Sequence, residues 1–358
     1  MKELIKQIIP SNFYIEFRKH YYNIIGVFTK FKLDKSFKDF PKILVIGVSD
    51  HGNLGDQAIG YAQRQFLENS FPNKRIVEVP VRTPVSHISK IVNEKDIFIF
   101  NGGGNIGDLY SFVDVYYIPL MKRFSKNKKI FMPQSATFTT SPNPSEYNRL
   151  VKTFAQNGTN LTITARETKS FEIFKTIFAS NKVILTPDIV LTLDKQKAIS
   201  KSGALVLFRK DSEVVKSDED KKKKIISMLQ SRFEVTVSDT VVEHKVKIED
   251  RESELEQLWK KISEAEIVVT DRLHGMIFAI ITGTPCLVFD NYNSKIKYTY
   301  NDWINSKFNR AIEFIDEKVS NESELCKLIE KVTGQDVPKF NKEKAYYPLY
   351  EAVKEYLE

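Results

Sequence analysis

Cysteine is scarce in this sequence, and long apolar runs are missing. Only two of the 358 residues are cysteines, Cys286 and Cys326, and neither has partners at the spacing of a metal site. The sequence therefore predicts no disulfide framework and no metal centre, which is typical of a reducing cytoplasm. No apolar run is long enough to cross a bilayer and no cleavable signal peptide opens the chain, so we expect a cytoplasmic protein.

The remaining composition is that of a folded, basic protein. Hydrophobic residues make up 42% and charged residues 28%, which indicates a globular chain. A length of 358 residues is enough for two domains of ordinary size. The net charge of +8 suits nucleic acid, an anionic membrane or anionic substrates, and the distribution of the charge helps to choose among them.

The basic residues concentrate at the N-terminus. Residues 1–42 hold nine Lys/Arg against four acidic residues, interleaved with aromatic and aliphatic side chains. This pattern suits a helix lying on an anionic membrane and equally a helix packed on the first domain, and the sequence leaves both open. The lysine run at 221–224 follows a D-x-D pattern at 218–220. Acids followed by lysines favour a solvent-facing helix, with no metal and no nucleic acid.

Buried strands alternate with helical patterns along the middle of the chain. In the first half, we expect strands at 42–48, 75–81, 96–100, 129–132 and 161–165, with helices at 57–69, 88–93, 110–122 and 144–157. In the second half, we expect strands at 204–208, 233–237, 266–270 and 285–289, with helices at 218–230, 253–263 and 272–281. This alternation predicts the α/β class with mostly parallel sheets.

The pattern thins near residue 187 and then restarts, which predicts two Rossmann-like domains facing each other across a cleft. We expect a basic amphipathic segment at 1–41, a first domain at 42–185, a second at 186–318 and a helical tail at 319–358. Substrates commonly bind between such domains.

The first polar loop follows the first strand and reads Asp50-His51-Gly52-Asn53-Leu54-Gly55-Asp56-Gln57. Ligands of open α/β sheets bind outside the carboxyl ends of the strands, and glycines let a ligand approach the backbone. Asn53, Gly55 and Asp56 are therefore candidate substrate contacts, although Asp56 also stands where it could simply cap the next helix.

A glycine-rich loop follows the third strand and reads Asn101-Gly102-Gly103-Gly104-Asn105-Ile106-Gly107-Asp108. Its G-x-G-x-x-G spacing, taken alone, suggests dinucleotide binding. The loop follows a later strand, however, and Lys122 and Arg123 stand about where the acidic ribose ligand is expected. We therefore expect a glycine turn whose backbone amides face the cleft, with Gly103, Gly104 and Asn105 as candidate contacts.

The third motif joins a buried strand to a helix and reads Thr270-Asp271-Arg272-Leu273-His274-Gly275-Met276. Thr270 or Asp271 can cap that helix, and Arg272 and His274 then project near its first turn. A helix N-terminus and an arginine fork both bind phosphate and carboxylate groups. The convergence indicates an anion site, with Gly275 leaving room for a ligand; the alternative is a structural histidine at a strand end.

Two further arginines end strands. Arg166 follows the strand LTITA, and Arg209 follows the strand LVLF. Each stands at a carboxyl strand end and can point into the cleft, although an exposed arginine without a role is the ordinary alternative.

Together these motifs resemble the polysaccharide pyruvyl transferase family. The matching residues lie between about 42 and about 289: Asn53-Leu54-Gly55-Asp56, Gly102–Gly104 with Asn105, Ala165-Arg166-Glu167, Pro187-Asp188, Arg209 with Asp211, Thr270–Gly275 and Gly283-Thr284-Pro285. The run Asp271-Arg272-Leu273-His274-Gly275 is the most specific part.

The resemblance implies a fold like that of the two-domain GT-B glycosyltransferases. It implies transfer of the enolpyruvyl unit of phosphoenolpyruvate (PEP) to a sugar as a ketal, with release of phosphate and no cofactor or metal. The expected acceptor is a sugar of an exopolysaccharide repeat unit, as in biofilms, carried on a polyprenyl diphosphate at the inner face of the membrane. Peripheral membrane contact through residues 1–40 would fit this setting.

The resemblance assigns PEP binding to Arg272, Leu273, His274 and Arg166, and we add Arg209 as a further candidate. Arginines neutralise the two anions of PEP, His274 is the candidate acid for its methylene carbon, and Asp56 is the candidate base for the acceptor hydroxyl. Two alternatives stay open: a GT-B glycosyltransferase that uses a nucleotide sugar, and a non-catalytic module that binds saccharide or membrane.

Overall fold

The computed structural model describes residues 35–107, 113–138, 144–209, 219–291, 294–308, 310–316, 319 and 321–358. Most of the basic segment expected at 1–41 lies outside these ranges, as do Asp108 and Asp211 of the predicted motifs.

The chain divides into two compact units. Unit 1 comprises Met1–Asp50, Gln63–Asp188 and Tyr346–Glu358, and unit 2 comprises His51–Ala62 and Ile189–Ala345. This division differs from the expected domains in three places: residues 51–62 group with unit 2, residues 186–188 group with unit 1, and the C-terminal tail is shared between the units. The expected cleft stays a prediction.

Backbone hydrogen bonds explain why residues 51–62 belong to unit 2. The amide of Leu54 donates to the carbonyl of Thr240 (2.9 Å), and the amide of Val242 donates to the carbonyl of Gly52 (2.8 Å). Asn53 and Val241 form an antiparallel bridge between these bonds. Residues 52–54 are therefore paired with residues 240–242, which lie far away in the sequence.

Unit 1 is built on a parallel sheet. Its strands are β1 (Ile43–Val48), β2 (Ile76–Pro80), β3 (Ile97–Phe100), β4 (Gly103–Gly107), β5 (Lys128–Thr137), β6 (Leu161–Ala165) and β7 (Lys182–Leu185). Their order is β2-β1-β3-β5-β6-β7, with β4 paired to β5, and each pairing is parallel. Strand β2 lies on one side of β1, and β3 lies on the other. The loops after β1 and β3 therefore flank a topological switch point of the sheet.

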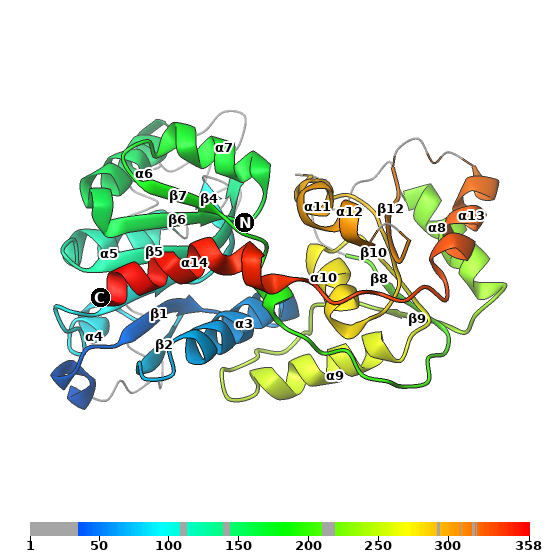
Figure 1. Ribbon diagram of the computed structural model, residues 1–358, viewed down its shortest axis with the longest axis horizontal. Helices are drawn as coiled ribbons and strands as arrows, with labels where there is room; N and C mark the ends of the chain where they lie inside the picture. Colours follow the sequence, from blue (N-terminus) through cyan, green and yellow to red (C-terminus); the bar gives the residue numbers. More distant parts are fainter. Residues whose placement is uncertain are drawn as a thin grey trace. The chain divides into compact units, whose positions relative to one another are not determined.

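Helices cover both faces of this sheet (Figure 1). They are η1 (Lys35–Asp39), α4 (Val85–Ile88), η2 (Val113–Tyr117), α5 (Ile118–Arg123), α6 (Pro144–Asn157), η3 (Gly158–Asn160) and α7 (Thr168–Ile177), with parts of α3 (Leu54–Ser70) and α14 (Lys342–Leu357). Apolar side chains of α5, α6 and α7 form one core with Phe98, Phe100 and Phe131 of the sheet.

The part of α14 in unit 1 packs through tyrosines. The ring of Tyr350 stacks on Phe71 with centroids 5.3 Å apart, and the hydroxyl of Tyr356 lies 2.8 Å from that of Thr162 on β6. The Tyr346 hydroxyl donates to the carbonyl of Asp188. The end of the chain is therefore part of the unit 1 structure.

Unit 2 repeats the same plan with a second parallel sheet. Its strands are β8 (Ala204–Leu207), β9 (Val235–Ser238), β10 (Ile267–Thr270), β11 (Cys286–Val288) and β12 (Ile312–Phe314). Their order is β12-β11-β10-β8-β9, and each pairing is parallel. The switch point of this sheet lies between β8 and β10.

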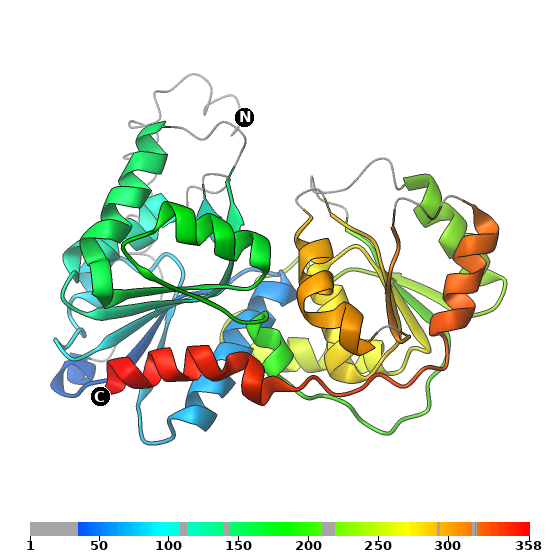
Figure 2. The same cartoon turned by 45° about the horizontal axis from the view of Figure 1, so that its top comes forward.

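Figure 2 shows helices on both faces of the second sheet. They are η4 (Ile189–Thr192), α8 (Glu219–Gln230), α9 (Arg251–Ser263), α10 (Leu273–Thr282), α11 (Lys295–Thr299), η6 (Tyr300–Ile304), α12 (Asn305–Phe308) and α13 (Glu322–Val332). Apolar residues of α8 and α13 form a core with β8, β10 and β11. Helices α9 and α10 contact each other, with the rings of Trp259 and Phe278 6.0 Å apart.

The predicted α/β class with two parallel sheets is confirmed. Strands β4, β7 and β12 were not predicted; β4 is glycine-rich, and β7 and β12 are four and three residues long. The helix expected at 88–93 is wrong; a short helix occupies Val85–Ile88 and begins directly after Pro84, a residue suited to a helix start.

Candidate functional site

The carboxyl ends of β8 and β10 meet at the switch point of unit 2. The amide of Arg209, two residues past β8, donates to Oδ1 of Asp271, which follows β10 (2.8 Å). Nζ of Lys222 on α8 donates to Oδ2 of the same carboxylate (2.6 Å). Asp271 is buried, so this carboxylate ties the two strand ends and one helix together.

The prediction of a solvent-facing lysine run is wrong for Lys222. Its side chain is 10% exposed and its ammonium lies 5.2 Å from the ring centroid of Phe208. The next lysine, Lys223, is 76% exposed. Helix periodicity explains the difference, since successive residues point about 100° apart around the axis and only one of the pair faces the sheet.

Thr270, not Asp271, holds the start of α10. Its Oγ1 accepts from the amide of Arg272 (3.0 Å) and donates to the carbonyl of Leu207 (2.8 Å). A Cβ added at Gly275 would lie 2.3 Å from this same oxygen. Gly275 therefore permits close packing of α10 on β10, and the expectation that it leaves room for a ligand is wrong.

Arg272 forms a two-point ion pair with Asp239. Nε of Arg272 lies 2.6 Å from Oδ1 of Asp239, and Nη2 donates to Oδ2 (2.8 Å). The two side chains are only 9% and 16% exposed. Asp239 directly follows β9, so the ends of three neighbouring strands contribute side chains or amides to this site.

The turn at residues 51–56 lies against His274. A Cβ at Gly55 would lie 2.3 Å from Nδ1 of His274, so the imidazole rests directly on the backbone of the turn. The ring is half-buried, and its centroid is 5.9 Å from that of Phe278 one turn along α10. Two motifs that are more than 200 residues apart in the chain are therefore neighbours within one unit.

Asp56 is not the N-cap of α3. The helix begins at Leu54, and Oδ1 of Asn53 accepts from the amide of Gly55 (3.0 Å). Oδ2 of Asp56 accepts from Nδ2 of Asn53 (3.0 Å) and lies 3.5 Å from Nε2 of His51. The carboxylate of Asp56 remains 35% exposed, so solvent reaches it.

Leu273 begins α10, and its side chain is buried in the apolar interior of unit 2. The group that it can offer to an anion is its backbone amide in the first turn of the helix.

In unit 1 the predicted glycine turn is strand β4, and glutamines bind part of its backbone. The amide of Gly102 donates to Oε1 of Gln63 (3.2 Å), and the amide of Asn105 donates to Oε1 of Gln134 (3.3 Å). Both glutamines are fully buried. The expectation that these amides face a ligand is therefore wrong for Gly102 and Asn105.

Arg166 lies in a buried acidic network of unit 1. Its Nη1 donates to Oδ2 of Asp188 (2.7 Å), and its Nε donates to Oγ of Ser135 (2.7 Å). The hydroxyl of Ser135 in turn donates to Glu167 (3.0 Å), whose pKa is raised because burial disfavours the charged carboxylate. Arg166 is therefore buried and paired, so the alternative expectation of an exposed arginine is wrong.

Gly104 is a neighbour of Arg166, because a Cβ at Gly104 would lie 3.9 Å from Nη2 of the arginine. Unit 1 therefore holds Gly103, Gly104, Asn105 and Arg166, and unit 2 holds the other predicted site residues.

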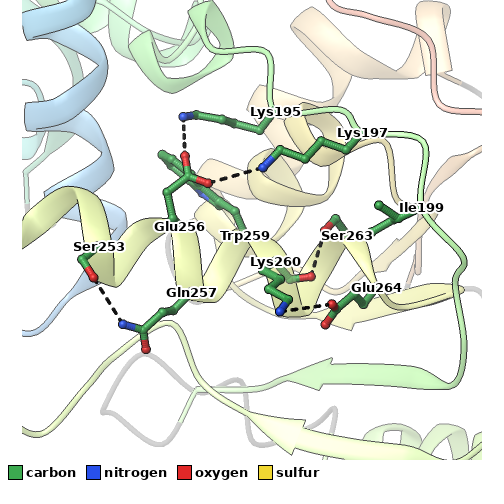
Figure 3. Close-up of a pocket in the computed structure, with 10 residues that line it drawn as sticks. All are labelled: Lys195, Lys197, Ile199, Ser253, Glu256, Gln257, Trp259, Lys260, Ser263 and Glu264. Atoms are coloured by element: carbon green, nitrogen blue, oxygen red, sulfur yellow. Dashed lines mark hydrogen bonds and ion pairs between the residues drawn. The ribbon is translucent and has the colours of Figure 1, made fainter.

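A cavity of about 410 Å³ lies on unit 2 between α9 and the segment at 195–199 (Figure 3). Its polar side chains pair with one another: Lys195 with Glu256 (2.6 Å), and Lys260 with Glu264 (3.8 Å). None of the predicted site residues lines it.

Within the described ranges, His, Cys, Asp and Glu side chains form no group of three or more that could hold a metal ion. Among the same residues, we find no helix that combines the length and the apolar character needed to cross a bilayer.

Sequence reasoning missed Asp239, His51 and Lys222. Asp239 has a weak local signal, since it stands two residues after the strand predicted at 233–237, whereas Asp271 directly follows the strand predicted at 266–270. His51 was part of the first polar loop but was not singled out. Nothing in the local sequence distinguishes Lys222 from its three neighbouring lysines.

The family model for polysaccharide pyruvyl transferase matches residues 53–294. The chain belongs to the polysaccharide pyruvyl transferase family. It is therefore a transferase, with a role in pyruvyl transfer to polysaccharide. The match covers residues 53–56 of the turn, β4, Arg166 and the Arg272–His274 run, so the family's region includes nearly all of the site described above.

Curated proteins from a bacterium and from a yeast are similar to this chain. General stress protein 30 of Bacillus subtilis (strain 168) is 35% identical over 90% of this chain and 94% of its own length. Pyruvyl transferase 1 of Schizosaccharomyces pombe is 25% identical over 83% of this chain and 74% of its own length. A crystal structure of a functionally uncharacterised Klebsiella pneumoniae protein is similar in fold, with a TM-score of 0.52, 20% identity, and coverage of 79% of this chain and 95% of that one.

Proposed function

We propose that the enzyme transfers the enolpyruvyl unit of PEP to a sugar of an exopolysaccharide repeat unit and closes it as a pyruvate ketal, with release of phosphate. The observation that carries the proposal is the placement of Arg272 and His274 at the start of α10, next to the switch point of the second sheet. Ligands of open α/β sheets bind at this place.

The charges of PEP match this helix start. PEP carries a carboxylate and a phosphate on one enol carbon, and both anions need cationic or N–H partners before the enol can react. Arg272 supplies a fork of N–H donors, and the first turn of α10 supplies backbone amides and a partial positive charge. Arg209 stands beside this site through its contact with Asp271.

His274 is the proposed acid. Its imidazolium gives a proton to the methylene carbon of PEP, which becomes the methyl group of the product, and C2 becomes electrophilic. An acceptor hydroxyl then adds to C2 and loses its proton to a base. A second hydroxyl of the same sugar displaces phosphate from C2 and closes the ketal ring, and its proton passes to the departing phosphate.

Asp56 is the proposed base for the acceptor hydroxyl. Its carboxylate lies on the turn that contacts His274, is partly exposed, and is oriented by Asn53. This position suits a group that receives a proton from a hydroxyl while the imidazole delivers one to the enol.

The proposal includes the setting of the reaction. The acceptor is carried on a polyprenyl diphosphate at the inner face of the cell membrane, and the protein is cytoplasmic, with residues 1–40 as a peripheral membrane contact. The basic and aromatic composition of that segment supports this setting.

Calorimetric titration of PEP into the wild type, Arg272→Ala and Arg232→Ala tests the proposal. Arg232 is the matched control, since it is an arginine of unit 2 that pairs with Glu330 on the surface. We expect binding by the wild type and the control, and a loss of at least about tenfold in affinity for Arg272→Ala. Binding of a nucleotide sugar and not of PEP would overturn the proposal in favour of a glycosyltransferase.

A further inference from the structure

We infer that Asp239 is a positioning residue that orients Arg272 for the donor anion. The inference rests on the proposed function, because it takes PEP as the ligand of Arg272. Asp239 lies outside every motif that the sequence pattern singled out, and it enters the site through the fold alone.

The ion pair uses one defined edge of the guanidinium. Asp239 meets Nε and Nη2, the side edge of the arginine fork, at 2.6 and 2.8 Å. A guanidinium has five N–H donors in a rigid plane, and its end edge, formed by Nη1 and Nη2, can receive a second anion bidentately. A carboxylate on the side edge therefore sets the plane in which the end edge meets PEP.

Asp239 is itself fixed by the backbone. Its Oδ1 accepts from the amide of Thr240 (2.6 Å), and the carbonyl of Thr240 accepts from the amide of Leu54 (2.9 Å). Residues 239–242, which we call the strap, continue this pairing through the bridge between Asn53 and Val241. The strap thus connects Arg272 to the turn that carries Gly55 and Asp56.

The strap contacts both Arg272, through Asp239, and the turn at residues 51–56. His274 contacts Gly55 directly, and Arg272 contacts the same turn through Asp239 and the strap. The two donor-site residues at the start of α10 are therefore both held against the segment that bears the proposed base. A shift of the turn would change the plane of the Arg272 guanidinium and also the position of the His274 imidazole.

The alternative role for Asp239 is that of a competitor, which PEP would displace from Arg272. Displacement would leave a mostly buried carboxylate without its cation, which is costly. The two roles predict opposite results. Removal of a competitor strengthens PEP binding, and removal of a positioning carboxylate weakens it.

The test is calorimetric titration of PEP into the wild type, Asp239→Ala, Asp239→Asn and the control Glu249→Ala, whose carboxylate is 69% exposed. We expect a loss of about tenfold or more for Asp239→Ala, because a misplaced binding group costs up to about a hundredfold. Asp239→Asn keeps the shape and one acceptor oxygen, so it should recover part of the loss. The control should bind as the wild type does.

Steady-state kinetics provide a readout that a general loss of stability would not give. In the Arg272→Ala background, Asp239→Ala should cause no further fall in kcat/KM for PEP, because Asp239 acts through the arginine. Unchanged or tighter PEP binding by both Asp239 variants, or a full additional loss in the double variant, would overturn the inference alone. A wild type that does not bind PEP would overturn the proposed function and this inference together.

Discussion

Gly55 leaves just enough space for the imidazole of His274: a Cβ at residue 55 would lie 2.3 Å from Nδ1. Real atoms do not approach so closely, so a methyl group there must push the ring away. The contact joins the start of α3 to the start of α10 and fixes where the proposed acid stands.

Gly55→Ala should therefore displace His274 and lower kcat by about a hundredfold, because small misplacements of a catalytic group have effects of this size. Glu68→Ala is the control, since it changes an exposed side chain on the same helix. Assays of phosphate release from PEP with a saccharide acceptor would measure the effect. Equal rates for the two variants would show that the ring position does not matter for the reaction.

Asp56→Asn should lower turnover much more than PEP affinity, because the proposed base acts on the acceptor and not on the donor. We expect kcat to fall by roughly 10²- to 10⁴-fold, the usual contribution of a general base. Phosphate release and calorimetric PEP binding would be measured on the same preparation. Glu68→Gln, on the same helix and 39% exposed, is the matched control. A fall in PEP affinity with normal turnover would contradict the assignment.

Lys222→Met should destabilise unit 2, because it leaves the buried carboxylate of Asp271 without its cation. Removing one partner of a buried ion pair costs about 3–5 kcal/mol. The exposed neighbour Lys223 is the control, and Lys223→Met should change the free energy of unfolding by less than about 0.5 kcal/mol. Urea unfolding would measure both. The double variant Lys222→Met/Asp271→Asn should recover part of the loss, and no recovery would show that the pair itself is not the cause.

Lys129 should make the stability of unit 1 depend on pH. It is fully buried, its ammonium donates to the carbonyl of Asn127 (2.5 Å), and burial lowers its pKa from 10.5 to about 7. Between these values the unfolded chain holds a proton that the folded chain has lost. Unfolding therefore takes up a proton, and the free energy of unfolding rises with pH across this window.

Lys129→Met should remove this contribution. We expect the wild type to gain on the order of 3 kcal/mol relative to Lys129→Met between pH 7 and pH 10. Lys126→Met is the control, because Lys126 is exposed in the same turn region. Urea unfolding at several pH values would measure the difference, and parallel curves for the wild type and Lys129→Met would contradict the prediction.

The sequence predicted well those parts of the site that are formed by consecutive residues. Arg272 and His274 follow a buried strand and open a helix, so their place at a strand end follows from the local pattern. Lys222 could not be placed in this way, because its burial depends on which side of α8 faces the sheet. Asp239 could not be linked to Arg272, because that contact arises only when β9, β8 and β10 are side by side.

The same limit explains the errors at the glycine-rich loop. Its spacing indicated a turn with backbone amides available to a ligand. Two of these amides instead donate to Gln63 on α3 and Gln134 on β5. A glutamine inside a helix or strand gives no sign of the backbone group that it will reach. The parallel pairing of the strands, by contrast, followed from the alternation of buried runs and helices, because parallel strands require crossover connections.

The pairing of residues 51–62 with the strap has a practical consequence for dissecting the protein. A fragment limited to residues 189–345 would retain Arg272 and His274. It would lack Leu54, whose amide donates to Thr240, and Gly55, which contacts the imidazole of His274. The second half of the chain alone therefore does not contain all of unit 2. An autonomous version would need the 51–62 stretch fused back on, for example by a short Gly/Ser link to one of its ends.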